Sequence, residues 1–160
     1  MDNAGEDKGP KAGRACNGRN ILKKVMVFGA FDGFHPGHLD FFRQAKKFGD
    51  FLIVSVGTDK NVEKIKGKKP LFSEEERLDL VANLKIVDRA VLGAAHDFYV
   101  QIKQQAPDVI CLGYDQWSTE KEVTSNLRGV GLLNTEVYRL KPYSADRAKS
   151  TIVKNLSVDF

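Results

Sequence analysis

The chain has 160 residues, of which 29% are charged, and its formal net charge is +4. This length suits a single domain with a buried core, and so mild a positive charge does not by itself indicate nucleic acid binding. No apolar stretch is long enough to span a bilayer, and Asp2, Glu6 and Asp7 argue against an organellar transit peptide. The two cysteines, Cys16 in a polar segment and Cys111 in an apolar run, are not expected to pair, so we expect a cytoplasmic protein without a nucleic acid or membrane partner.

The first 20 residues contain almost nothing that a core could bury, so residues 1–20 are expected to form a disordered tail and residues 21–160 the domain. An apolar run at 24–29 ends in glycine and predicts a buried strand. Pro36 and Gly37 then open a helix that ends near Gly49. A second apolar run, 51–57, is apolar at nearly every position, as in parallel sheets.

Four lysines follow in the stretch KIKGKK, residues 64–69. This stretch is interpreted as a loop, either a solvated one or a flexible arm that meets phosphate groups. Ser73 and Glu76 then form a capping box, which predicts a helix with Leu78, Val81 and Leu84 facing inward. Further strands are expected at 89–93, 108–113 and 135–140, and further helices at 97–105, 119–129 and 145–156.

Strand and helix alternate five times, which predicts an α/β fold: a Rossmann-like doubly wound sandwich with a parallel sheet of about five strands. Ligands bind such sheets at the carboxyl ends of the strands, where the strand order reverses. The residues that directly follow each strand are therefore the candidates for a site.

The first strand leads into FGAFDGFHPGH, residues 28–38, which holds two of the three histidines. Pro36 suits the first turn of a helix, so His38 should lie where free N–H groups attract anions. Together, His35 and His38 would make a compact phosphate clamp. A metal site is not predicted, because a helical metal pair prefers a spacing of four and no third ligand is apparent.

These residues resemble the HxGH signature of the nucleotidyltransferase superfamily, in the branch of cytidylyltransferases and adenylyltransferases. The similarity continues in AKKFGD (45–50), Glu75-Glu76-Arg77 and KIVDRAVLG (85–93), while APDVICLGYDQW (106–117) is most similar to the archaeal-type FAD synthases. The resemblance implies transfer of a nucleoside monophosphate, with Mg²⁺ accompanying the triphosphate and pyrophosphate leaving. The acceptor would be FMN, with ATP as donor, or a small phosphorylated alcohol such as glycerol 3-phosphate, with CTP as donor.

The resemblance also implies site residues. His35 and His38 would stabilise the transition state, Ala30 and Phe31 would offer backbone contacts to phosphates, and Pro36 and Gly37 complete the helix start. Nucleotide contacts are further expected from Asp115, Tyr143, Ser150 and Thr151. The turn Ala148-Lys149-Ser150-Thr151 departs from the Ser-Thr-Thr-Lys or Ser-Ser-Ser-Lys of the family, and this departure leaves a catalytically silent nucleotide-binding module as an alternative.

The acceptor phosphate is expected to meet Lys66 and Lys68, with Lys69 beside them, and Arg77. Arg77 could instead pair with Glu74 or Glu75. Tyr114 and Trp117 are interpreted either as stacking partners for a ring or as packing, and His96 as a bystander. A homodimer is expected from the resemblance, and four phenylalanines are assigned to the core or a subunit contact: Phe34, Phe41, Phe42 and Phe48.

Overall fold

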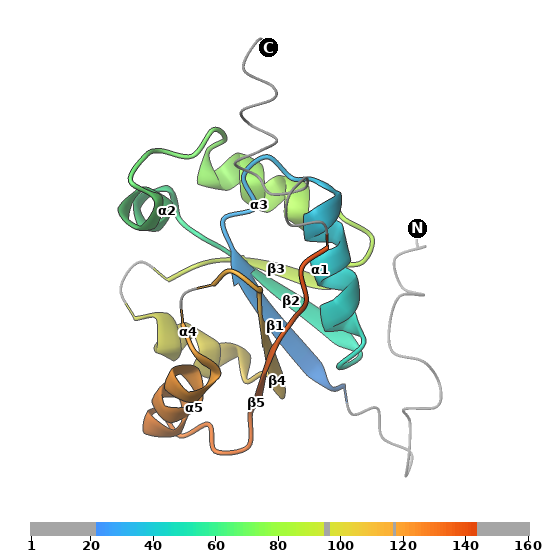
Figure 1. Cartoon of the computed structure of the whole chain (residues 1–160), viewed down its shortest axis with the longest axis vertical. Helices are drawn as coiled ribbons and strands as arrows, with labels where there is room; N and C mark the ends of the chain where they lie inside the picture. Colours follow the sequence, from blue (N-terminus) through green and yellow to red (C-terminus); the bar gives the residue numbers. More distant parts are fainter. Residues whose placement is uncertain (1–21, 95–96, 117, 144–160) are drawn as a thin grey trace.

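The computed structural model describes residues 22–94, 97–116 and 118–143, and Figure 1 shows its arrangement. Several expectations fall outside these residues: the tail 1–20, His96, Trp117 and the helix at 145–156 with Lys149, Ser150 and Thr151. None of the described helices is long and apolar enough to cross a membrane.

Five parallel strands form one sheet in the order β3-β2-β1-β4-β5. Their bounds are β1 Lys24–Gly29, β2 Phe51–Val56, β3 Arg89–Leu92, β4 Val109–Leu112 and β5 Glu136–Arg139. Each lies within a residue or two of its predicted range. The expected parallel sheet and α/β fold are therefore confirmed.

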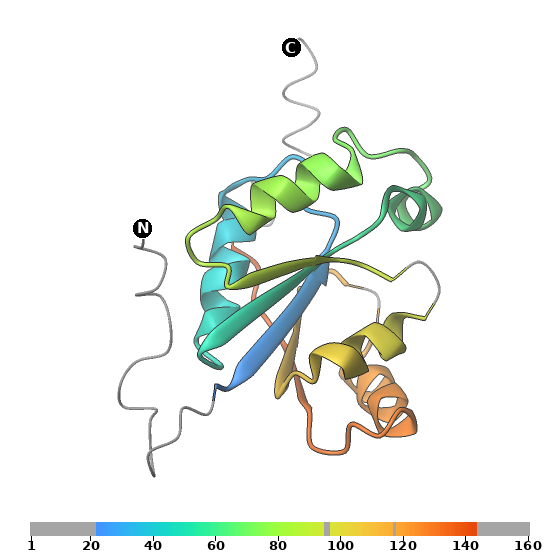
Figure 2. The same ribbon diagram turned by 180° about the vertical axis from the view of Figure 1, so that it is seen from behind.

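The helices cover both faces of the sheet, as Figure 2 shows from behind. Four were predicted: α1 Pro36–Lys46, α3 Glu74–Ala82, α4 Phe98–Gln105 and α5 Glu120–Gly129. One face packs a core that includes Val25, Val54 and Phe42 of α1, and the other packs Met26, Ile53 and Ile102 of α4. Because strand side chains alternate between faces, β1 contributes to both cores.

The helix α2, Asp59–Lys66, was not predicted. Thr58 caps its N-terminus by accepting a hydrogen bond from the Asn61 N–H, and Gly67 ends it in the left-handed conformation, with φ of 80°. Interpreting residues 64–69 as a loop was therefore wrong for its first half. Lys64 and Lys66 lie on the last turn of α2, and Lys68 and Lys69 follow it.

Candidate active site

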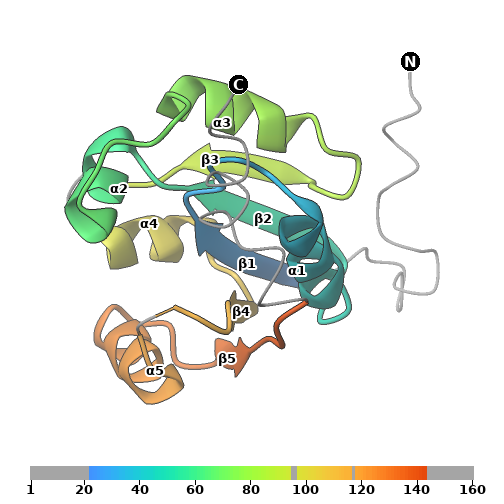
Figure 3. The same cartoon turned by 45° about the horizontal axis from the view of Figure 1, so that its top comes forward.

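The strand order reverses between β1 and β4, and the loops after these two strands lie at the same edge of the sheet. The chain leaves β1 toward α1 on one face and leaves β4 toward α5 on the other, which Figure 3 shows from above the carboxyl ends. The loop 30–35 and residues 113–116 therefore flank the crevice where parallel α/β sheets bind ligands. The histidine pair lies in the first of them.

Phe31 shapes the loop after β1. It adopts φ of 52°, a left-handed conformation that is rare for a residue with a bulky side chain. Its ring is buried and lies so close to Gly29 that a Cβ there would come within 2.7 Å of the ring. The ring also meets His38 edge-on at 5.3 Å and Phe42 at 5.1 Å. This packing holds a strained backbone at Phe31, four residues before His35.

His35 and His38 cap α1 reciprocally. The Nδ1 of His35 accepts a hydrogen bond from the Gly37 N–H at 3.1 Å, and the Nδ1 of His38 accepts one from the His35 N–H at 3.3 Å. An imidazole nitrogen that accepts carries no proton, so each neutral ring carries its proton on Nε2. The caps thus set the same tautomer in both histidines, with Nε2 as a donor.

The two imidazoles stack with their centroids 3.9 Å apart. The Nε2 of His35 is buried and has no hydrogen-bond partner among the described residues. Burial also lowers the pKa of His35 below its ordinary value of 6.5, which keeps the ring neutral near pH 7. A buried donor without a partner at a helix N-terminus fits an anionic ligand such as a phosphate group.

Asp32 ties the same loop to the segment that leads into α3. Its carboxylate accepts hydrogen bonds from the Leu71 N–H at 2.6 Å and the Phe72 N–H at 3.0 Å. The side chain is almost fully buried. This link places the segment before α3 beside the histidine loop, although the two are about 40 residues apart in sequence.

Arg77 of α3 is also buried, with 1% of its surface exposed. Its guanidinium donates to the backbone carbonyls of Ala30 at 2.8 Å, Gly57 at 2.7 Å and Phe72 at 2.9 Å, and pairs with Asp59 at 2.7 Å. The carboxylate partner thus comes from α2. This side chain joins the residues that directly follow β1 and β2 to α2 and to the segment before α3, a role that the sequence did not indicate.

A second set of contacts holds the loop after β4. The Gln116 side chain accepts from the Gly113 N–H at 2.7 Å and donates to the Phe28 carbonyl at 3.2 Å, so it bridges the ends of β4 and β1. Arg139 of β5 donates to the carbonyls of Gly113 and Gln116 and pairs with Glu120. Gln116 lies inside the motif that carried the resemblance, whereas no sequence signal pointed to Arg139.

The other expected site residues lie around this edge. Asp115 is exposed in the loop after β4, Tyr114 is half-buried beside it, and Tyr143 is 57% exposed. Lys66 and Lys68 are exposed at and just beyond the end of α2. Their expected roles stay predictions.

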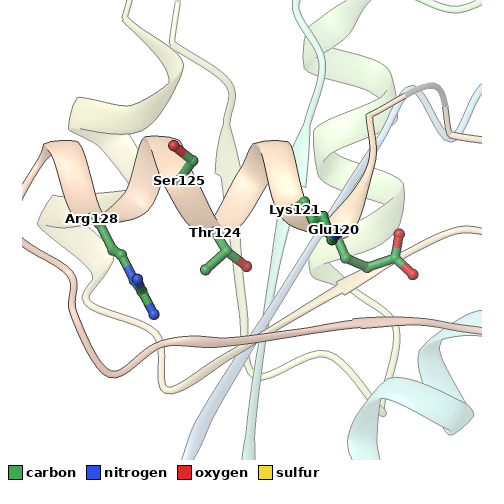
Figure 4. Close-up of a pocket in the computed structure, with 5 residues that line it drawn as sticks. All are labelled: Glu120, Lys121, Thr124, Ser125 and Arg128. Carbon is green, nitrogen blue, oxygen red and sulfur yellow. The ribbon is translucent and has the colours of Figure 1, made fainter.

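The described residues hold no group of three or more His, Cys, Asp or Glu side chains that could bind a metal ion. A shallow hollow of about 350 Å³ lies along α5, lined by Glu120, Lys121, Thr124, Ser125 and Arg128 (Figure 4). None of these residues belongs to the histidine loop, so we do not assign the chemistry to this hollow.

A family model described as cytidylyltransferase-like matches residues 26–156. An FAD synthase from Picrophilus torridus is 38% identical over 136 residues, 85% of this chain and 96% of that protein. An FAD synthase from Archaeoglobus profundus is 48% identical over 120 residues, 75% of this chain and 76% of that protein. The crystal structure of a lipopolysaccharide core biosynthesis protein from Thermoplasma volcanium is 38% identical and aligns with a TM-score of 0.73, covering 77% of this chain and 99% of that one.

Proposed function

Because this chain belongs to the cytidylyltransferase-like family of nucleotidyltransferases, we propose that it transfers the adenylyl group of ATP to FMN, giving FAD and pyrophosphate. The observation that carries nucleotidyl transfer is the capped histidine pair, with its buried, unpartnered His35 Nε2. The choice of FMN is supported by relatives named FAD synthase, which this chain matches over most of its length.

The reaction needs positioning and charge stabilisation more than proton transfer. An oxygen of the FMN phosphate attacks the α-phosphorus of ATP and forms a new P–O bond. The bond from that phosphorus to the bridging oxygen of the β-phosphate breaks, and pyrophosphate leaves with the electron pair. A phosphate monoester is already ionised near pH 7, so no general base is required.

The histidine pair is suited to the charge that builds up on the α-phosphate. Both Nε2–H groups are donors by virtue of the caps, and the N-terminus of α1 adds a positive partial charge. ATP would enter as its Mg²⁺ complex, in which the ion neutralises part of the triphosphate charge. Mg²⁺ keeps several waters and needs few protein ligands.

The test is pyrophosphate release with ATP or CTP crossed with FMN or glycerol 3-phosphate, with FAD identified by chromatography. We expect turnover with ATP and FMN alone. His35→Ala and His38→Ala should each lower kcat roughly 100-fold or more, the loss typical of removing a transition-state donor. Leu133→Ala serves as the control. This exposed residue lies between α5 and β5, at the amino ends of the strands, whereas the candidate site lies at their carboxyl ends.

Two outcomes would contradict the proposal. Turnover with CTP and glycerol 3-phosphate instead would identify a cytidylyltransferase for small phosphorylated alcohols. Nucleotide binding without turnover on either acceptor would indicate a silent binding module.

A further inference from the structure

Phe72 combines a fixed backbone with an exposed aromatic side chain. Its N–H donates to Asp32 at 3.0 Å, and its carbonyl accepts from the Arg77 guanidinium at 2.9 Å. Despite these two anchors, 44% of the residue is exposed. An aromatic ring held in this way offers a large contact area at a low entropy cost on binding.

Both anchors connect Phe72 to the candidate phosphate site. Asp32 lies in the same loop as His35, three residues before it. Arg77 holds the Ala30 carbonyl at 2.8 Å with the guanidinium that also holds Phe72. The backbone of Phe72 is therefore joined to both ends of the segment 30–32. The Asp32 side chain makes the link to residue 32, and the Arg77 side chain makes the link to Ala30.

The chain just before Phe72 is apolar and basic. We define the apolar–basic edge as residues 64–72, KIKGKKPLF, which carry four lysines and no acidic residue. Ile65 is 64% exposed and Leu71 is 66% exposed. A ligand that matches this edge needs an apolar ring system and a negative charge, and FMN has both.

We propose that Phe72 is the platform on which the isoalloxazine ring of FMN stacks, with Leu71 extending the apolar surface and the lysines of the apolar–basic edge attracting the phosphate. This inference rests on the proposed function and assigns its acceptor specificity to particular residues. A small phosphorylated alcohol has no ring to place on Phe72, so the platform would favour FMN over such an acceptor.

The test measures FMN binding directly, through the quenching of flavin fluorescence, together with steady-state kinetics. Phe72→Ala should raise the Kd and KM for FMN roughly tenfold, the loss typical of one aromatic stacking partner, while the KM for ATP stays unchanged. Phe72→Tyr should bind FMN like the wild type. Riboflavin lacks the phosphate, so Phe72→Ala should weaken the binding of riboflavin and of FMN to the same extent. Lys68→Ala should weaken the binding of FMN but not that of riboflavin.

Phe98→Ala is the matched control, because Phe98 is 41% exposed and begins α4 on the other face of the sheet. Equal FMN affinity in Phe72→Ala and wild type, with FAD still formed by both, would overturn the platform and leave the proposed function intact. A larger loss in Phe98→Ala than in Phe72→Ala would place the ring on the opposite face and also overturn it. If the wild type neither quenches FMN fluorescence nor forms FAD, both the platform and the proposed function fail.

Discussion

His35 occupies a position where other residues are more usual. Helix N-caps favour Ser, Thr, Asp and Asn, which accept from backbone N–H groups through an oxygen. His35 accepts through Nδ1 and keeps Nε2 for another partner. One residue therefore ends the loop, starts the helix and presents a donor, and this explains why an imidazole is found in place of a simpler cap.

We predict that this cap makes stability depend on pH. Burial lowers the folded-state pKa of His35, so the unfolded chain takes up the proton more readily as the pH falls below 6.5. The contribution of His35 to the free energy of unfolding should be complete above pH 6.5 and be lost as the pH falls toward the folded-state pKa. Urea unfolding at pH 7.5 and pH 5.5 measures this change.

Two variants separate the cap from the titration. His35→Asn keeps a good cap that does not titrate, so its free energy of unfolding should fall less than that of the wild type between the two pH values. His35→Ala removes the cap and should lose about 1 kcal/mol at pH 7.5. Parallel pH dependence in the wild type and His35→Asn would refute this explanation.

For individual residues, the sequence predicted which residues form the candidate site better than it predicted their backbone and side-chain conformations. His35, Pro36 and His38 were recognised from their order and their place after a strand. The left-handed φ of Phe31 was not, because such values usually belong to glycine or asparagine and here depend on the packing of one ring. The reciprocal caps likewise depend on the side-chain rotamers of two histidines.

Among the secondary-structure elements, Arg77 makes the connection that joins most parts of the site. From a buried position, it contacts the residues that directly follow β1 and β2, the segment before α3, and Asp59 of α2. A buried charge without such partners is costly. The expectation that it meets the acceptor stays a prediction. Its contacts support a positioning role for the loop 30–32.

We predict that Arg77→Lys lowers the free energy of unfolding by about 3 kcal/mol, because an ammonium group cannot reach the same four partners and leaves buried carbonyls unpaired. Thermal and urea unfolding measure the loss. Arg43→Lys is the control, because Arg43 is exposed on α1 and should change stability by less than about 0.5 kcal/mol. A loss below 1 kcal/mol in Arg77→Lys would show that the guanidinium contacts contribute little.

Ten helices and strands lie in the described ranges, and nine of them were expected from apolar runs and capping signals. The one missed, α2, has eight residues and a single buried side chain, Val62, so hydrophobic periodicity could not reveal it. Its boundaries were readable only from Thr58 and Gly67. Two lysines that were expected to meet the acceptor are affected, because Lys66 ends this helix and Lys68 follows Gly67.

Across the whole molecule, the strand order decides where the site forms. Alternating elements predicted a parallel sheet. No local sequence pattern, however, predicts that β4 pairs with β1 on the side opposite to β2 and β3. This pairing transfers the chain to the other side of β1 and places the loop 30–35 and residues 113–116 at one crevice. Gln116 then bridges the two strands on either side of the reversal.

A ligand in this crevice would contact loops that lead to helices on opposite faces of the sheet, and β1 belongs to both hydrophobic cores. Binding should therefore stabilise the entire fold in one step. We predict that α,β-methylene-ATP with Mg²⁺, whose altered bridge prevents transfer, raises the free energy of unfolding by about 2.7 kcal/mol at 100 times its Kd, in a single thermal transition. At the same analogue concentration, His38→Ala should show a smaller rise, because it lacks one Nε2 donor. A rise of equal size in His38→Ala, or a transition that splits when the analogue binds, would mean that the nucleotide is held elsewhere or by one half of the sheet alone.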